Sequence, residues 1–239
     1  PSPLVLVLPR VLTAPIWLVA MRRLRPWRPD HSVTAAPLQG FLTFGLPVVS
    51  VSLVNALRLH ADKLVIGALL GAEGLGAYFM AFNAGLSIAT SFVAAFDKVV
   101  FPHLSAVTEI KASRVAIMGT ALVAPVVLAQ SLLAPFYVPI LLGADWAYIA
   151  PVVSILCISA LPLTLWSAAA AQLRVNGRPD IELMVTITLT AALLIIAVPA
   201  SSWGLMGLAT AHLTIVTVVV GLAALPVLWP RNTPVKQEI

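Results

Sequence analysis

The sequence predicts an all-α fold: a polytopic bundle of about seven transmembrane helices joined by short loops. Hydrophobic residues make up 60% of the 239 residues and charged residues only 10%, whereas a soluble domain averages about 25% charged residues. The mean hydropathy is +1.02. Apolar runs of about 20 residues, the length that crosses a bilayer, follow one another along the whole chain.

Each expected helix is an apolar run bounded by Gly, Pro, Asn, Asp or charged residues. The runs cover residues 4–20, 38–70, 77–104, 115–142, 150–173, 183–200 and 205–228. Backbone polar groups inside a bilayer must be satisfied within the segment, so these runs are expected to be helices. The short connections include GAEGLG at 71–76, GADWAY at 143–148, NGRPD at 176–180 and SSWG at 201–204.

Basic residues mark every second connection. They are Arg22, Arg23, Arg25, Arg28, Lys111, Arg114, Arg174, Arg178, Arg231 and Lys236. The alternate connections, at 71–76, 143–148 and 201–204, contain no Lys or Arg. Because positively charged loops stay on the cytoplasmic side, the C-terminus is predicted to be cytoplasmic. The net charge of +5 therefore indicates basic loops beside a membrane rather than a nucleic-acid partner.

A charged stretch interrupts the second run. Arg58, His60, Asp62 and Lys63 lie close together in the sequence. Counted from the outer end of the run at about 1.5 Å per residue, Asp62 lies about 12 Å deep and Arg58 about 18 Å deep in hydrocarbon about 30 Å thick. Asn55, Arg58 and Asp62 share a helix face, and Arg58 can pair with Asp62 at i, i+4. His60 and Lys63 point elsewhere.

Two interpretations of this face stay open. In the first, Arg58 and Asp62 neutralise each other and hold neighbouring helices together. In the second, the face is the polar wall of a cavity that binds a charged solute or a coupling ion.

Three further charged residues are secondary site candidates. Asp97 and Lys98 are expected at the cytoplasmic rim, where snorkelling or an interfacial ion pair is the default. Arg174 ends the fifth run and is expected to be a topology anchor. Gln130 and Gln172 are single polar residues in apolar runs, which is typical of helix–helix contacts.

Nothing in the sequence indicates an enzyme. It contains no phosphate-binding G-x-x-x-x-G-K-[ST], no H-E-x-x-H and no G-x-S-x-G motif. The few carboxylates are scattered, so no acid–base pair is visible. The one cysteine, Cys157, is interpreted as a small buried apolar residue. No metal or cofactor site is expected.

Four stretches resemble, in order and spacing, motifs of the oligosaccharide flippases of the polysaccharide transporter group, within the multidrug/oligosaccharidyl-lipid/polysaccharide exporter superfamily. The stretches are DKLVIGALLGAEGLGAYFMAFN at 62–83, VVFPHLSAV at 99–107, PFYVPILLGADWAYIAPVVSIL at 135–156 and LRVNGRPDIEL at 173–183. Together they are specific, and the resemblance covers roughly residues 40–228.

The resemblance implies two bundles of about six helices around a central cavity, working by alternating access in the bacterial inner membrane. The implied substrate is an undecaprenyl-diphosphate-linked sugar repeat, moved to the outer leaflet during lipopolysaccharide or exopolysaccharide biosynthesis. The match falls on the C-terminal bundle. The expected segments are the last helix of an N-terminal bundle at 1–21, a basic cytoplasmic linker at 22–37, a six-helix bundle at 38–229 and a cytoplasmic tail at 230–239.

The first residue is Pro, within an apolar run, and we expect the chain to be a piece of a longer protein. Its N-terminal bundle, the lipid bilayer and a polysaccharide polymerase are expected partners. A proton or sodium gradient, rather than a cofactor, would supply the energy.

A lipid diphosphate is attracted by cations in a cavity. Arg58 is therefore the first substrate-binding candidate, with Asp62 restraining it and Asn55 on the same face, while Lys63 and His60 come second. The nearest alternative is a drug or small-cation antiporter of the same superfamily, which would prefer an acidic cavity. A membrane glycosyltransferase would need a large outer loop, and a non-transporting scaffold would tolerate neutralisation of this face.

Overall fold

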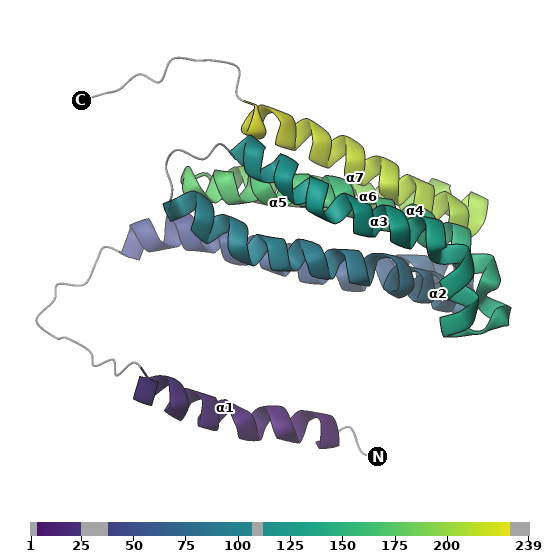
Figure 1. Ribbon diagram of the computed structural model, residues 1–239, viewed down its shortest axis with the longest axis horizontal. Helices are drawn as coiled ribbons and strands as arrows, with labels where there is room; N and C mark the ends of the chain where they lie inside the picture. Colours follow the sequence, from purple (N-terminus) through teal and green to yellow (C-terminus); the bar gives the residue numbers. More distant parts are fainter. Residues whose placement is uncertain (1–3, 25–37, 107–111, 230–239) are drawn as a thin grey trace, which may run out of the picture. The chain divides into compact units, whose positions relative to one another are not determined.

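The computed structural model describes residues 4–24, 38–106 and 112–229, and every element in these ranges is helical (Figure 1). The elements are α1 (Leu4–Leu24), α2 (Leu38–Ala106), α3 (Ala112–Leu142), the 3₁₀ helix η1 (Ala144–Ile149), α4 (Ala150–Ile158), α5 (Ala160–Val175), α6 (Pro179–Ala200), the 3₁₀ helix η2 (Ser201–Trp203) and α7 (Gly204–Leu228). The predicted all-α class is confirmed. The chain divides into two compact units, residues 1–38 and 39–239.

Four segments within the described residues are long and apolar enough to cross a membrane. They are Leu38–Ser87, Ala112–Leu142, Ala144–Val175 and Pro179–Leu228. The predicted count of about seven is therefore not confirmed, and α1 is not among the four. Two of the segments contain 50 residues each, and a straight helix of that length would measure about 75 Å, more than twice the hydrocarbon thickness.

Gly71 divides α2 into a first arm, residues 38–70, and a second arm, residues 72–106. Its backbone angles, φ 71° and ψ −175°, are not helical, and Figure 1 shows the two arms side by side. Only glycine adopts this region readily, because it has no Cβ. The turn predicted over 71–76 is thus a reversal at one residue, with helix resuming at Ala72.

A second glycine separates the two helices of the last candidate span. Gly204 has φ 62° and follows η2, and α6 packs against α7. By contrast, the predicted run at 150–173 consists of α4 and α5, which meet at a turn at Ser159.

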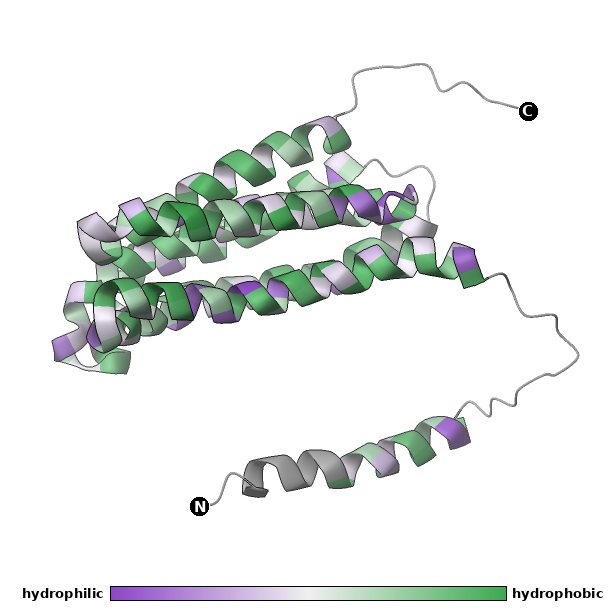
Figure 2. Cartoon of the chain, turned by 180° about the vertical axis from the view of Figure 1, so that it is seen from behind, coloured by the Kyte–Doolittle hydropathy of each residue, from purple (hydrophilic) through white to green (hydrophobic). Residues whose placement is uncertain are grey.

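Small residues fill the interior of the second unit. Ala168, Ala169, Ala170 and Ala171 of α5 are all buried, and α5 packs against α3, α6 and α7. Small side chains let helices approach closely in lipid, where no hydrophobic effect drives them together. Many large apolar side chains also lie on the outside, and Figure 2 shows hydrophobic residues along much of the helices of the second unit.

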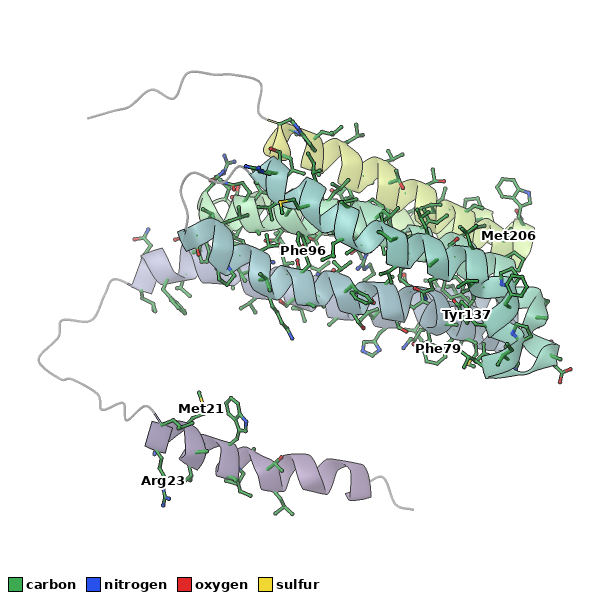
Figure 3. The ribbon with its side chains drawn as sticks, in the orientation of Figure 1. Met21, Arg23, Phe79, Phe96, Tyr137 and Met206 are labelled. Atoms are coloured by element: carbon green, nitrogen blue, oxygen red, sulfur yellow. The ribbon has the colours of Figure 1, made fainter. Side chains whose placement is uncertain are left out.

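The second arm of α2 is attached to α3 and α4 around Gly85. Gln130 of α3 donates its Nε2 to the carbonyl oxygens of Ala84 at 3.0 Å and Gly85 at 2.8 Å. The hydroxyl of Tyr137, labelled in Figure 3, donates to Ala84 O at 3.2 Å. A Cβ on Gly85 would lie 3.0 Å from the carbonyl oxygen of Val153 in α4. Further along, the ring of Phe96, also labelled in Figure 3, covers Gly119 of α3.

Helix α1 continues to Leu24, with Arg22 and Arg23 of the predicted linker in its last turn. Residues 25–37 of the predicted linker, Lys111 and the predicted tail at 230–239 lie outside the described residues.

Candidate functional site

A cavity of about 310 Å³ lies between the two arms of α2, α5 and α6. Its walls are half polar, and the polar or charged side chains are Ser52, Asn55, Arg58, Thr90, Asp97, Ser167, Arg174, Glu182 and Thr186. Apolar and aromatic side chains, including Phe101 and Trp166, complete the lining. The cavity brings together the primary candidates Asn55 and Arg58 with the secondary candidates Asp97 and Arg174.

Arg58 and Asn55 come from the first arm of α2. The spacing of three residues puts both side chains on one helix face, and Arg58 Nη2 donates to Asn55 Oδ1 at 3.3 Å. Both residues are half-buried. The predicted direct pair between Arg58 and Asp62 is not formed: the ion pairs within the described ranges are elsewhere, and Asp62 acts on Arg58 only at longer range.

Asp62 lines two smaller cavities and not the large one. It lines a cavity of about 20 Å³ together with Tyr78 and His212, and one of about 130 Å³ between the arms of α2. Seven residues of helix separate Asp62 from Asn55 by about 10 Å along the axis. The three residues therefore follow one face of the first arm, but the large cavity is lined only by Asn55 and Arg58 and not by Asp62.

Lys63 and His60 point away from the large cavity, as predicted from their positions on the helix. The Nζ of Lys63 lies 5.0 Å from the ring centroid of Phe79, a cation–π contact between the two arms. The side chains of both His60 and Lys63 are exposed on the described bundle.

Asp97 lines the cavity wall. The hydroxyl of Ser167 in α5 donates to Asp97 Oδ1, so this carboxylate has a polar partner on a neighbouring helix. Lys98, one position further along the helix, is exposed and does not line this cavity.

Arg174 joins α5 to α6 instead of acting only as a topology anchor. Its Nε donates to Glu182 Oε2 at 2.7 Å and its Nη2 to Glu182 Oε1 at 2.5 Å. Glu182 is 2% exposed, whereas the Arg174 side chain keeps 33% of its surface accessible. Asp97 also acts on Arg174 electrostatically.

Glu182 was absent from the sequence-based site, although a local signal pointed to it. Arg174 is in the last turn of α5 and Glu182 in the first turn of α6. A cation at a helix C-terminus and an anion at a helix N-terminus each complement the helix dipole. The tight turn at 176–177 between the two helices brings these ends together.

The four charged side chains of the cavity differ in how fully they are compensated. Glu182 is held by Arg174, and Asp97 receives the Ser167 hydroxyl. Arg58 has only a neutral amide as its hydrogen-bond partner among the described residues. Arg58 and Asp97 thus each have one neutral hydrogen-bond partner, whereas Arg174 and Glu182 compensate each other. Within the described residues, no cluster of three or more His, Cys, Asp or Glu is placed to hold a metal.

Two curated proteins show the chain's relationships. It is 22% identical over 185 residues to the amylovoran biosynthesis protein AmsL of Erwinia amylovora, a match that covers 75% of this chain and 47% of that protein. It is 23% identical over 162 residues to the lipopolysaccharide biosynthesis protein WzxC of Escherichia coli (strain K12), which covers 65% of this chain and 33% of that protein. The chain thus spans about half or less of the length of these relatives. No solved structure matches.

The family model described as "Polysaccharide biosynthesis protein" matches residues 2–151, well over half of the chain. This range includes both arms of α2, and with them Asn55, Arg58 and Asp97. The match agrees with the predicted family resemblance. The chain belongs to the polysaccharide biosynthesis protein family.

Proposed function

We propose that this chain forms part of a flippase that moves a lipid-linked oligosaccharide, an undecaprenyl-diphosphate-linked repeat unit, across the bacterial inner membrane. The cavity between α2, α5 and α6 would receive the diphosphate. Alternating access, driven by a proton or sodium gradient, would release the substrate on the other side.

Arg58 carries this proposal. Its guanidinium lines a 310 Å³ cavity near the predicted midplane, with Asn55 as its hydrogen-bond partner. An ionisable group at membrane depth is expensive and is normally retained for function. Arginine presents planar N–H donors that match phosphate oxygens in bidentate geometry. The unused donors of Arg58 are therefore suited to a diphosphate.

The proposed topology has about seven crossings. Gly71 and Gly204 reverse the backbone, so each 50-residue candidate span would cross twice, and α1 would add a further crossing. The ends of α5 and α6 at 175–179 would face the cytoplasm because Arg174 and Arg178 are basic. The cavity includes Arg174 and Glu182 at this end, where a lipid-linked precursor would enter from the inner leaflet.

The remaining parts of the proposal come from the family resemblance. Residues 1–21 would belong to an N-terminal bundle, the linker at 22–37 and the tail at 230–239 would be cytoplasmic, and the second bundle would complete the central cavity. A polysaccharide polymerase would use the flipped product.

The alternatives fit the described residues less well. A drug or small-cation antiporter would prefer an acidic cavity, but this cavity is also lined by the cations Arg58 and Arg174. A membrane glycosyltransferase would need room for chemistry in a loop, whereas the connections η1 and η2 contain six and three residues.

Export in cells tests the proposal. The complete protein carrying Arg58→Ala, expressed in a strain that lacks its own copy, should lower polysaccharide output by about 10- to 100-fold, equivalent to the 1.5–3 kcal/mol of a hydrogen bond to a charged group. Lys98→Ala, on the exposed surface of α2, is the matched control and should export normally. Normal output from Arg58→Ala at equal membrane expression would reject the proposal and favour a scaffold.

A further inference from the structure

We propose that Glu182 is a positioning residue: it holds the guanidinium of Arg174 by one edge so that the other edge faces the cavity and binds a phosphate of the lipid-linked substrate. This inference rests on the proposed function. It adds a second arginine to the site and assigns the buried carboxylate that fixes it.

The hydrogen bonds between the two side chains leave donors free. A guanidinium carries five N–H donors in a rigid fork. Glu182 accepts one from Nε at 2.7 Å and one from Nη2 at 2.5 Å, which are neighbouring atoms on the same edge. Three N–H donors of Arg174 remain, and none has another hydrogen-bond partner within the described part of the chain. Arg174 also lines the cavity, with a third of its side-chain surface accessible.

Glu182 stays with Arg174 when a ligand binds. Its side chain is 3% accessible, and separating a buried pair would leave an uncompensated charge inside the protein. Pro179 begins α6, and Glu182 lies in the first turn of that helix, so the carboxylate is fixed by regular backbone. The ligand therefore binds to the second edge of Arg174 and does not displace Glu182.

Arg174 and Arg58 then form a two-point site. Arg58 comes from the first arm of α2 and Arg174 from the last turn of α5, and both line the same cavity. Each guanidinium is held by a side-chain oxygen, from Asn55 in one case and from Glu182 in the other. A ligand with two linked phosphates engages both cations, whereas a monophosphate engages one fully.

Positioning and simple electrostatics make opposite predictions for Glu182→Gln. Removal of a negative charge beside the cavity would, by Coulomb attraction alone, tighten the binding of any anion. If Glu182 orients Arg174, the same substitution releases the guanidinium and weakens the binding of a diphosphate. The sign of the change in Kd thus separates the two explanations.

The experiment uses the complete protein in lipid nanodiscs, with undecaprenyl diphosphate and undecaprenyl monophosphate as probes. Glu182→Gln should raise the Kd for the diphosphate about tenfold, and the Kd for the monophosphate much less. The matched control is Asp180→Asn, which removes the exposed partner of Arg178, 3.4 Å away, from the same helix turn. It should leave both Kd values unchanged, because exposed ion pairs contribute little.

A double variant guards against misfolding. Arg174→Gln with Glu182→Gln buries no charge, and it should bind the diphosphate as weakly as Glu182→Gln alone, because a released Arg174 no longer contributes. Misfolding lowers the number of binding sites per protein, whereas loss of positioning raises Kd. A binding titration reports the number of sites and the Kd separately.

Three results would overturn the positioning role. They are an unchanged Kd for Glu182→Gln, a tighter one, and a double variant that binds a further tenfold more weakly. A wild-type protein that fails to prefer the diphosphate over the monophosphate would instead contradict the proposed function itself.

Discussion

Gln130 of α3 donates its amide Nε2 to the carbonyl oxygen of Gly85 in α2 at 2.8 Å, across 45 residues of sequence. The same nitrogen reaches Ala84 O at 3.0 Å. This contact attaches the second arm of α2 to the rest of the bundle. Because the same arm carries Asp97 and Thr90 into the cavity wall, the contact between Gln130 and Gly85 helps to position that wall.

Gln130→Leu should destabilise the bundle by about 0.6 kcal/mol, the average measured for hydrogen bonds between membrane helices, and by no more than about 1.7 kcal/mol, the largest value measured. The substitution removes both donors to α2 while keeping an apolar side chain of similar size. The midpoint of denaturant-induced unfolding in detergent measures the effect.

Gln172→Leu is the matched control, because the Nε2 of Gln172 bonds to Asn176 at the end of its own helix. Both glutamines were predicted to join helices, and the structure assigns that role to Gln130 but not to Gln172. Equal losses of stability in the two variants would contradict this assignment.

Gly85→Ala should destabilise by about 1–3 kcal/mol through overpacking. The new Cβ would lie 3.0 Å from Val153 O and 3.4 Å from Val153 Cα. Both are backbone atoms of α4, so they cannot move aside without shifting that helix. The free energy of unfolding measures the loss.

Gly221→Ala in α7 is the control for Gly85→Ala. A Cβ there meets nothing within 4 Å, and alanine favours the helix by about 1 kcal/mol over glycine. The two alanine substitutions are expected to change stability in opposite directions, and a Gly85→Ala protein as stable as Gly221→Ala would refute close packing at Gly85.

Gly71→Ala should destabilise by about 1–3 kcal/mol, the strain of a residue other than glycine in this backbone region. No atom lies within 4 Å of the added Cβ, so the loss would be conformational and not steric. Gly76→Ala, with equally open space but helical backbone, should be neutral or stabilising. Thermal unfolding of both variants compares them directly, and equal midpoints would argue against the reversal at Gly71.

Asp97→Asn should tighten the binding of undecaprenyl diphosphate about fivefold, on the order of 1 kcal/mol. The substitution removes a negative charge from the cavity, while asparagine can still accept the Ser167 hydroxyl. The predicted consequence for export is slower release. Asp145→Asn, an exposed position in η1, is the control, and weaker binding by Asp97→Asn would show that this carboxylate serves the ligand in another way.

Much of the helical pattern could be predicted from the sequence because helix ends coincide with loop-forming residues. The predicted run at 115–142 compares with α3 at Ala112–Leu142, and the run at 205–228 with α7 at Gly204–Leu228. The turn after Leu70 was predicted as six residues but consists of Gly71 alone. Composition marks a break in a helix, but it does not reveal how many residues the backbone needs to reverse.

The candidate site was predictable only where its residues share one helix. Asn55 and Arg58 follow from a spacing of three, and both line the cavity. Asp62 is on the same face but lies about one turn beyond Arg58, outside the large cavity. Tertiary contacts decide the rest, since Asp97 meets Ser167 across 70 residues of sequence and Arg174 meets Glu182 across a turn.

The central claim is that Arg58 binds the diphosphate of a lipid-linked oligosaccharide during transport. The most direct test is the rate at which the complete protein, reconstituted into liposomes, flips a fluorescent undecaprenyl-diphosphate-linked sugar. Arg58→Gln should slow flipping by at least about tenfold, while Lys63→Gln, whose cation lies over Phe79 outside the large cavity, should flip at close to the wild-type rate. Wild-type flipping by Arg58→Gln, or an equal loss in Lys63→Gln, would contradict the claim.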